Sequence, residues 1–240
     1  MIKIGRWNWF DFEELESTND KAAAFSQRPP APFYVVTAKR QTKGRGRRGR
    51  EWISQDGNLF MSVGLPFAIK DIGHLVFIVS LSLFSEIPLF LKWPNDLLAA
   101  NQKISGILLE KGENNYIIAG IGVNIVSAPD LGKEASYRSS SLKALGIQAD
   151  RTEILKYFLH EFDWYLHLWK EQGFASVKKI WLENVHGLGE EIVVNGEKEK
   201  VTGIFLGVDE NGLLLLENNN KVMKIFAGDV VYIQKDEKKE

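Results

Sequence analysis

The sequence predicts an α+β protein in which a mixed sheet with helices is followed by a small β-barrel. Two apolar runs, Lys103 to Glu110 and Tyr116 to Ile125, flank a turn-forming Gly-Glu-Asn-Asn stretch and predict a β-hairpin. Asp150 to Gln172 repeats apolar side chains every three or four residues, which predicts a long amphipathic helix. From about Gly187 onward, short apolar runs alternate with turn sequences, as in a small barrel. Because hairpins outnumber parallel crossovers, these features favour α+β over βαβ winding.

The first half of the chain alternates predicted strands with predicted helices. Ser17-Thr18-Asn19-Asp20 supplies polar side chains that cap the start of a helix, and a proline cluster beginning at Pro29 ends it. Aromatic and β-branched runs predict the strands. The expected elements are, in order, a strand Trp7 to Phe12, a helix through Lys21 to Phe25, strands Phe33 to Ala38 and Asn58 to Leu65, and a helix Asp71 to Glu86.

The second half contains the hairpin, two helices and the barrel. A short strand, Leu89 to Trp93, ends at Pro94, and Phe174 to Val185 is expected to form a helix after the long one. The five barrel strands are separated by turn sequences at Asn195-Gly196, at Asp209 to Gly212 and at Asn218 to Asn220. We therefore divide the chain into residues 1–186, residues 187–235 and a charged tail, residues 236–240.

The composition is that of a globular protein without cysteine chemistry. The chain has 240 residues, of which 45% are hydrophobic, so it is long enough to bury a sizeable core. Zero cysteines exclude disulfides, thiolate metal ligands and a Cys nucleophile. No apolar run is long enough to span a bilayer and the N-terminus lacks a signal-peptide core, which predicts a cytoplasmic protein. His160 and His167 are expected to be ordinary helix residues rather than metal ligands.

A basic, glycine-rich segment from Lys39 to Arg50 is the strongest binding signal. Seven of its twelve residues are Lys or Arg and none is acidic, although the net charge of the chain is only −1. Clustered arginines repel and glycines make the backbone costly to order, so we expect the loop to be mobile until an anion binds. A basic run is often only a solvated face or a nucleic-acid patch. The balance of 30 Lys+Arg against 31 Asp+Glu favours a small anion over a polymer.

Three further motifs each have a structural and a functional interpretation. Residues 92–96 (Lys-Trp-Pro-Asn-Asp) form either a proline turn or a cation and a carboxylate at a strand end. Gly106 and Gly122, the latter two residues before Asn124, either bend a strand or let a ligand approach the backbone. Ser17-Thr18-Asn19 either caps a helix or binds a small polar head group such as a ureido ring. Taken singly, none of these motifs decides the function.

Five motifs occur along the chain in a specific order. They are Ser-Thr-Asn from Ser17, Gly-Arg-Gly-Arg-Arg-Gly-Arg-x-Trp from Gly44, Lys-Trp-Pro-Asn-Asp-Leu from Lys92, Lys-Ile-Ser-Gly-Ile-Leu-x-Glu from Lys103 and Gly-x-Gly-x-Asn from Gly120. In this combination the chain resembles the biotin–protein ligases, from about Trp9 to Tyr232. The DNA-binding helix-turn-helix of repressor-type members is expected to be missing, so we expect no DNA partner.

The resemblance implies a two-step reaction. Biotin and ATP form biotinyl-5′-AMP and pyrophosphate, and biotin then moves to one lysine of a biotin carboxyl carrier protein. It further implies Mg²⁺ with the nucleotide, a class II synthetase-like catalytic domain of the biotin/lipoate ligase type, and an SH3-like C-terminal domain. Members of the family are monomers or homodimers, and an exposed sheet edge offers one route to a dimer.

The resemblance also implies roles for individual residues. Fixed cations offset the repulsion between a carboxylate and an α-phosphate, and we expect Lys103 to be the central one. Asp96 is a candidate for positioning Mg²⁺ and for accepting a proton from the acceptor lysine. The implied catalytic residues are Lys103, Arg45 and Asp96. The implied biotin-binding residues are Ser17, Thr18, Asn19, Gln41, Gly44, Arg45, Gly46, Arg47, Lys103 and Gly106. The implied ATP-binding residues are Arg48, Arg50, Trp52, Lys92, Asn95, Asp96 and Asn124.

Two other functions stay open at this point. A lipoate or octanoate ligase or transferase has the same fold, but those families do not typically combine this Gly/Arg loop with Lys-Trp-Pro-Asn-Asp. A non-catalytic biotin-responsive or nucleic-acid-binding module would use the basic loop without needing Lys103 and Asp96. Family members often cover the adenine with an aromatic ring after the strand that ends near Asn124, and Tyr137 is the ring available there.

Overall fold

The computed structural model describes residues 1–67, 71–84, 89–130, 138–196 and 199–232. Two of the predictions above, the adenine cover at Tyr137 and the charged tail 236–240, lie outside these residues. Within the described residues, no helix combines the length and the apolar character needed to cross a bilayer.

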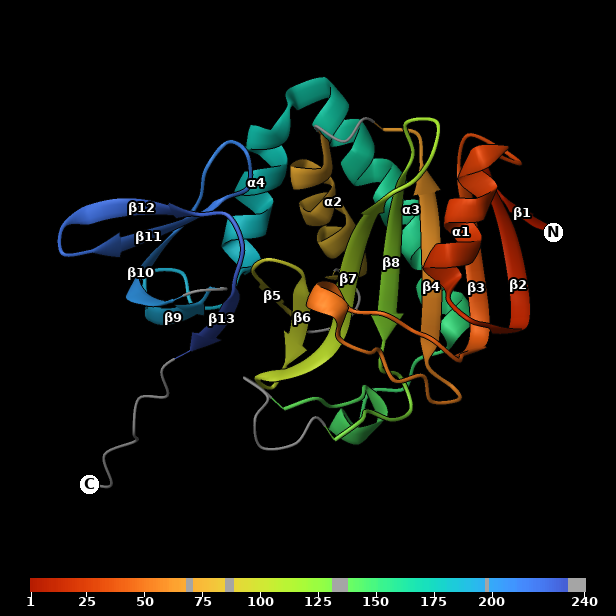
Figure 1. The fold of residues 1–240 in the computed structure, drawn as a ribbon, viewed down its shortest axis with the longest axis horizontal. Helices are drawn as coiled ribbons and strands as arrows, with labels where there is room; N and C mark the ends of the chain where they lie inside the picture. Colours follow the sequence, from red (N-terminus) through yellow and green to blue (C-terminus); the bar gives the residue numbers. More distant parts are fainter. Residues whose placement is uncertain (68–70, 85–88, 131–137, 197–198, 233–240) are drawn as a thin grey trace.

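An eight-stranded sheet carries the site (Figure 1), with the strand order β1-β2-β3-β4-β8-β7-β6-β5. Its β2 and β3 are parallel because a helix connects them, and the other neighbours pair antiparallel. The strands are β1 Ile2–Ile4, β2 Trp7–Leu15, β3 Tyr34–Gln41, β4 Leu59–Leu65, β5 Phe90–Lys92, β6 Asp96–Ala99, β7 Gln102–Lys111 and β8 Ile117–Val123. The predicted mixed sheet is therefore confirmed, and hairpins dominate it.

Helices cover both faces of this sheet (Figure 1). Helix α1 (Thr18–Gln27) packs on β3, β4 and β8, whereas α2 (Ile72–Phe84) packs on β5, β6 and β7 from the other side. Helices α3 (Arg151–Gln172) and α4 (Phe174–Asn184) pack on α2. Because both faces are covered, every residue of β4 and β8 is buried, and these strands read as continuous apolar runs rather than as an alternation.

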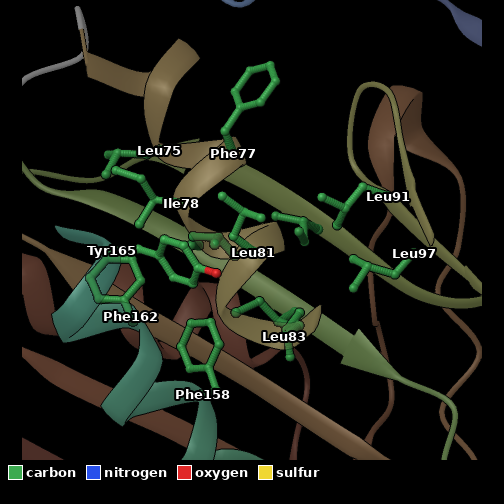
Figure 2. Packing of buried hydrophobic residues seen from close by; sticks show 14 of the residues in the cluster. Leu75, Phe77, Ile78, Leu81, Leu83, Leu91, Leu97, Phe158, Phe162 and Tyr165 are labelled. Atoms are coloured by element: carbon green, nitrogen blue, oxygen red, sulfur yellow. The ribbon is translucent and has the colours of Figure 1, made fainter. Parts of the chain in front are cut away.

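The main core lies between α2, α3 and the back of the sheet. Figure 2 shows Phe158, Phe162 and Tyr165 of α3 projecting toward Leu81 and Ile78 of α2. The spacing of these aromatic residues places them on one face of α3, as the sequence predicts. Each fully buried phenylalanine contributes roughly 1.5–3 kcal/mol of transfer free energy.

Two strands were missed in the sequence, and one of them changes the interpretation of Asp96. The prediction placed Asp96 inside a proline turn, but it is the first residue of β6, paired with Lys92 of β5 across a hairpin. The turn itself holds Trp93, Pro94 and Asn95. The short β1 (Ile2–Ile4) was not predicted either, because three exposed or half-buried residues leave little apolar pattern.

A second, five-stranded antiparallel sheet follows, with the strand order β12-β11-β10-β9-β13. Its strands are β9 Glu191–Asn195, β10 Lys200–Val208, β11 Leu214–Asn218, β12 Lys221–Ile225 and β13 Asp229–Tyr232. Five strands were predicted, and this small sheet is consistent with an SH3-like barrel. The two-residue turn lies at Asn219-Asn220, where both φ angles are positive (50° and 59°). Asn195 and Gly196 themselves belong to the paired part of the hairpin, since Asn195 pairs with Lys200 and the amide of Gly196 donates to the carbonyl oxygen of Glu199 at 2.9 Å.

Hydrogen bonds connect the C-terminal strands and their turns to the preceding part of the chain. The indole Nε1 of Trp93 donates a hydrogen bond to the carbonyl oxygen of Gly212 at 3.1 Å, and the ring of His74 lies 3.0 Å from the carbonyl oxygen of Glu210. Tyr232 Oη donates to the carbonyl oxygen of His186 at 3.1 Å. These contacts hold the end of β13 next to the β5–β6 hairpin. The division of the chain at residue 187 stays a prediction.

Candidate active site

A cavity of about 150 Å³ opens between the Gly/Arg loop, the start of α1, the strands β7 and β8, and the beginning of β13. Most residues proposed from the sequence line it. These are Ser17, Thr18, Asn19, Gln41, Arg45, Gly46, Arg47, Arg50, Trp52, Asn95, Asp96, Lys103, Gly106 and Asn124. Three proposed residues, Gly44, Arg48 and Lys92, are not part of its lining. The fold therefore brings together segments that are separated by more than a hundred residues in the sequence.

One end of the cavity is built by the N-terminus of α1. Ser17 is the N-cap, and its hydroxyl accepts from the amide of Asp20, so the structural interpretation of this motif is confirmed. Thr18 donates twice to the side-chain carbonyl of Gln41, from its amide (2.7 Å) and from its hydroxyl (3.0 Å). Asn19 is 5% exposed. The same residues thus cap the helix and present polar groups to the cavity.

The floor of the cavity is made of glycines, and an indole ring lies on it. A Cβ on Gly122 would lie 2.4 Å from the Trp52 ring, and one on Gly106 would lie 2.9 Å from the same ring. In the structure the ring of Trp52 lies over Gly122, and the approach of a flat ligand at this glycine stays a prediction. Gly120 similarly admits Asn19, whose Oδ1 would be 2.1 Å from an added Cβ.

Two buried polar atoms of the cavity residues have no hydrogen-bond partner among the described residues. They are Nε1 of Trp52, a donor, and Oδ1 of Asn124, an acceptor. The amide nitrogen of Asn124 donates to the carbonyl oxygen of Ser140 at 3.2 Å, which fixes the orientation of the amide group. An unpaired buried polar atom costs about 1–3 kcal/mol. A ligand that pairs with these atoms would remove that cost.

A largely buried ion pair lies in the cavity wall. Lys103 Nζ is 2.7 Å from Asp96 Oδ1, and the ammonium also lies 5.5 Å from the centre of the Trp52 ring. Both side chains are largely buried, with 16% and 9% of their surface exposed. The register of β6 with β7 explains the pairing, since Asp96 is opposite Gly106 and a bulge follows at Leu97. Lys103 is therefore held in one place before any substrate binds.

Lys92 lies behind this ion pair. It is 4% exposed, pairs with Asp96 across the β5–β6 hairpin, and its ammonium lies 5.9 Å from the centre of the Tyr232 ring. Burial lowers the pKa of Lys92 to about 8, and the charge of Asp96 acts in the opposite direction. Burial also raises the pKa of Tyr232. Lys92 is thus beside Asp96 and outside the cavity lining, and its assignment to ATP binding stays a prediction.

The arginines of the basic loop are paired with carboxylates of the same chain. Arg45 makes a two-bond fork to Asp20, with distances of 2.7 and 2.8 Å. Arg50 lies 2.7 Å from Asp229 of β13, and Arg48 lies 3.7 Å from it. The loop also contains a three-residue 3₁₀ helix, Arg47–Gly49. The mobility of the loop without a ligand stays a prediction, but its anchors are now identified as acidic side chains.

Gly44 and Arg47 shape the basic loop. Gly44 does so through its backbone, and Arg47 does so through a contact with Asn95. Gly44 has no room for a side chain, because an added Cβ would lie 2.4 Å from the carbonyl oxygen of Trp52. Its own carbonyl accepts the amide of Trp52 at 3.0 Å, which closes the loop. Arg47 donates to the side-chain oxygen of Asn95 at 2.6 Å and thereby ties the loop to the β5–β6 turn.

Three residues of the site were missed in the sequence. Ser62 of β4 bonds Asn19 Oδ1 at 2.5 Å, Glu110 of β7 accepts from both Asn19 and Arg45, and Asp229 of β13 faces the loop. Glu110 closes the Lys-Ile-Ser-Gly-Ile-Leu-x-Glu motif, so it carried a signal. Ser62 and Asp229 gave no signal in the sequence. A serine within a strand is common, and Asp229 is 179 residues away from Arg50, so neither belongs to a motif.

The carboxylates of the site suit Mg²⁺ only if the ion is also bound to the phosphates of a substrate. Within the described residues, no group of three or more His, Cys, Asp or Glu side chains could hold a metal. Asp96 is one of the carboxylates that line the cavity, and Lys103 already pairs with one of its oxygens. Mg²⁺ commonly keeps several waters and binds through one or two carboxylates plus substrate phosphates, and Asp96 fits that limited role.

Comparisons with known proteins decide the family. The model of the biotin/lipoate A/B protein ligase family matches residues 9–124, and that of the biotin protein ligase C terminal domain matches residues 187–231. A biotin--[acetyl-CoA-carboxylase] ligase from Paracoccus denitrificans is 31% identical over 90% of this chain and 97% of its own length. The chain belongs to the biotin protein ligase family. The bifunctional ligase/repressor BirA of Bacillus subtilis is 30% identical, and the match covers 71% of its length.

A solved structure of this family has the same fold. A biotin protein ligase from Aquifex aeolicus in complex with biotin and ATP superposes with a TM-score of 0.78 at 31% identity, covering 93% of this chain and 97% of that one. The resemblance read from the five motifs is thereby confirmed, as is the expected α+β fold with a small C-terminal sheet.

Proposed function

We infer that this biotin protein ligase family member is an ATP-dependent enzyme that joins biotin to a protein lysine. The observation that carries the inference is the cavity in which Lys103, the basic loop and the start of α1 converge. Its contents suit the reaction, because a carboxylate and a triphosphate are both anions and the cavity gathers cations from separate elements. A lipoate or octanoate enzyme is the less favoured alternative, because the names of two relatives specify biotin.

In the first step, an oxygen of the biotin carboxylate attacks the α-phosphorus of ATP. An O–P bond forms, the bond from the α-phosphorus to the bridging oxygen breaks, and pyrophosphate leaves. We propose that Lys103 stabilises the charge that gathers at the α-phosphate, since its ammonium is already held by Asp96 and needs no rearrangement. Arg47 and Arg50 provide further cations at the loop side of the cavity. Mg²⁺, bound to the phosphates, would neutralise the leaving pyrophosphate.

In the second step, the neutral amine of an acceptor lysine attacks the acyl carbon of biotinyl-5′-AMP. A C–N bond forms, the bond from the acyl carbon to the AMP oxygen breaks, and the amine loses a proton. We propose Asp96 as the proton acceptor. For that role the Lys103–Asp96 pair has to open, because an ammonium at 2.7 Å stabilises the charged carboxylate and makes it a weak base.

We propose that biotin and the nucleotide occupy opposite ends of the cavity. The hydroxyl and amide groups of Ser17, Thr18 and Asn19 suit the ureido ring at the α1 end. The unpaired Oδ1 of Asn124 suits a donor on the nucleotide. Trp52 was assigned to the nucleotide from the sequence, and its position over Gly106 and Gly122 supports a role for its ring near the junction of the two proposed ends.

The natural partner is proposed to be a biotin carboxyl carrier domain. We also propose a cytoplasmic location, which the absence of cysteines supports, and a monomer or homodimer without a DNA partner. Residues 1–186 are proposed as the catalytic unit and residues 187–235 as the C-terminal unit.

The test is the mass of a purified carrier domain after incubation with the protein, biotin and Mg-ATP. The expected result is a mass increase of one biotin, lost when ATP is omitted or when the carrier lacks its target lysine. A lipoate adduct in parallel reactions, with no biotin adduct, would support the lipoate alternative. Pyrophosphate release without transfer would contradict ligation to that carrier, and tight RNA binding with no pyrophosphate release would favour a binding module.

A further inference from the structure

Glu110 lies at the edge of the proposed biotin end of the cavity and has no role in the reaction described above. It is on β7, on the same face of the strand as Gly106 and Leu108, both of which line the cavity. It is near the end of the strand, where the backbone leaves the cavity, and 36% of its side chain is exposed. Its position brings its carboxylate to two residues of the site that come from other elements.

The first contact fixes the amide of Asn19. Asn19 Nδ2 donates to Glu110 Oε2 at 2.5 Å, and Asn19 Oδ1 lies 2.5 Å from the hydroxyl of Ser62. A flipped amide would turn its carbonyl oxygen toward the carboxylate, and two acceptors would then face each other. Asn19 Oδ1 also packs closely against Gly120, where an added Cβ would lie only 2.1 Å from it. Asn19 therefore presents one defined pattern of donor and acceptor to the cavity.

The second contact anchors the basic loop. Arg45 Nη2 donates to Glu110 at 3.2 Å (Oε2) and 3.4 Å (Oε1), and the fork to Asp20 uses Nη1 together with the same Nη2. Arg45 is thereby held between a carboxylate of α1 and a carboxylate of β7. Two acids on one arginine leave a net negative charge there, which does not favour a phosphate at Arg45. Its geometry is that of an anchor for the loop.

We propose that Glu110 is a positioning residue for biotin: it orients the Asn19 amide and anchors the Gly/Arg loop through Arg45. A carboxylate accepts hydrogen bonds only, so both neighbours can donate to it at once, and the charge strengthens the bond to Arg45. Glutamine at this position would keep an oxygen for Asn19 and lose the charge toward Arg45. Alanine would lose both contacts. The proposal rests on the inferred biotin-ligase function.

The test compares Glu110→Ala and Glu110→Gln with wild type in pyrophosphate release at varied biotin and ATP concentrations. Glu110→Ala is expected to raise the KM for biotin roughly tenfold, as for loss of one hydrogen bond to a charged group, with the KM for ATP within about twofold of wild type. Glu110→Gln should restore the KM for biotin to within about threefold. Glu16→Ala is the matched control, because it removes an exposed ion pair with Lys43 at the start of the same loop.

The possible outcomes separate the proposal from the function on which it rests. An unchanged KM for biotin in Glu110→Ala, with a lowered Tm, would mean that Glu110 is only structural and would overturn the proposal. An equal rise in the KM for biotin in the control Glu16→Ala would also overturn the proposal. If Glu110→Ala does not fold, an increased KM for biotin in Ser62→Ala, which frees the other side of the Asn19 amide, supports the orientation argument, and an unchanged KM refutes it. No biotin-dependent pyrophosphate release from wild type would instead refute the inferred function.

Discussion

Lys92 carries a buried charge whose contribution to stability can be measured directly. Its side chain is shielded by Tyr232 and lies beside Asp96, and burial lowers its pKa from 10.5 to about 8. Replacing it by methionine keeps much of its volume and removes the charge. The perturbation is therefore Lys92→Met, and the predicted effect is on how the free energy of unfolding depends on pH.

The magnitude follows from the pKa shift. Below pH 8, Lys92 is protonated in both the folded and the unfolded chain, and the full cost of burying the charge is present. Between pH 8 and 10.5 only the unfolded chain keeps the proton, so the free energy of unfolding rises with pH by about 1.4 kcal/mol per unit. Above pH 10.5 both states are neutral and the rise ends. The total gain over the window is roughly 3 kcal/mol.

The assay is urea unfolding of wild type and Lys92→Met at several pH values from 7 to 10.5. The difference between the two proteins isolates Lys92, because the other titrating groups are common to both. Wild type is expected to gain roughly 3 kcal/mol relative to the variant across the window. Lys43→Met is the control: the Glu16 carboxylate raises the pKa of Lys43, so no such gain is expected there. A difference that does not change with pH would refute the claim that Lys92 is desolvated.

Three other predictions concern the cavity. Lys103→Ala should abolish biotin-dependent pyrophosphate release and lower the free energy of unfolding by about 1–3 kcal/mol, because the ion pair between Lys103 and Asp96 is lost. Gly122→Ala should lower kcat/KM at least roughly tenfold and cost about 1–3 kcal/mol, since the new methyl group displaces the Trp52 ring. Amides 44–50 should exchange hydrogen more slowly with biotin and ATP bound, and Asp229→Ala should speed their exchange in the free protein.

Each of these has a result that would contradict it. Wild-type pyrophosphate release by Lys103→Ala would remove Lys103 from the catalytic step. Normal kinetics in Gly122→Ala would mean that the Trp52 ring is not part of the working cavity. Equal protection of amides 44–50 in the free and bound protein would exclude loop closure, and an unchanged rate in Asp229→Ala would mean that β13 does not hold the loop.

Much of the fold followed from local patterns in the sequence. The long helix α3 was predicted almost to the residue, because its capping Asp150 and the glycine after Gln172 mark both ends. The β7–β8 hairpin was predicted for the same kind of reason. Strands β1 and β6 were missed, since three or four residues are too short for a periodic pattern to emerge.

Only those residues of the site that belong to a sequence motif could be predicted. Each motif in the sequence names residues that are close together along the chain, at a helix start, in a loop, on a strand or across a hairpin, and most of them do line the cavity. Lys92 shows the limit, because its neighbours in the motif reach the cavity and it lies behind them. Which member of a motif faces a cavity depends on strand register, and a bulge such as the one after Leu97 changes the register without a clear sequence signal.

The sequence by itself determined the family, the two-sheet architecture and the residue types that the chemistry needs, because those depend on periodicity, turn residues and motif order. Only the tertiary structure decided which charges meet. It brought Asp229 into an ion pair with Arg50 of the basic loop. It brought Glu110 within hydrogen-bond distance of Asn19 and Arg45, and it packed the Trp52 ring against Gly106 and Gly122. The physical reason is that ion pairs and close packing act over a few ångströms in space, whereas these residues are far apart along the chain, and no local pattern encodes which distant strands become neighbours.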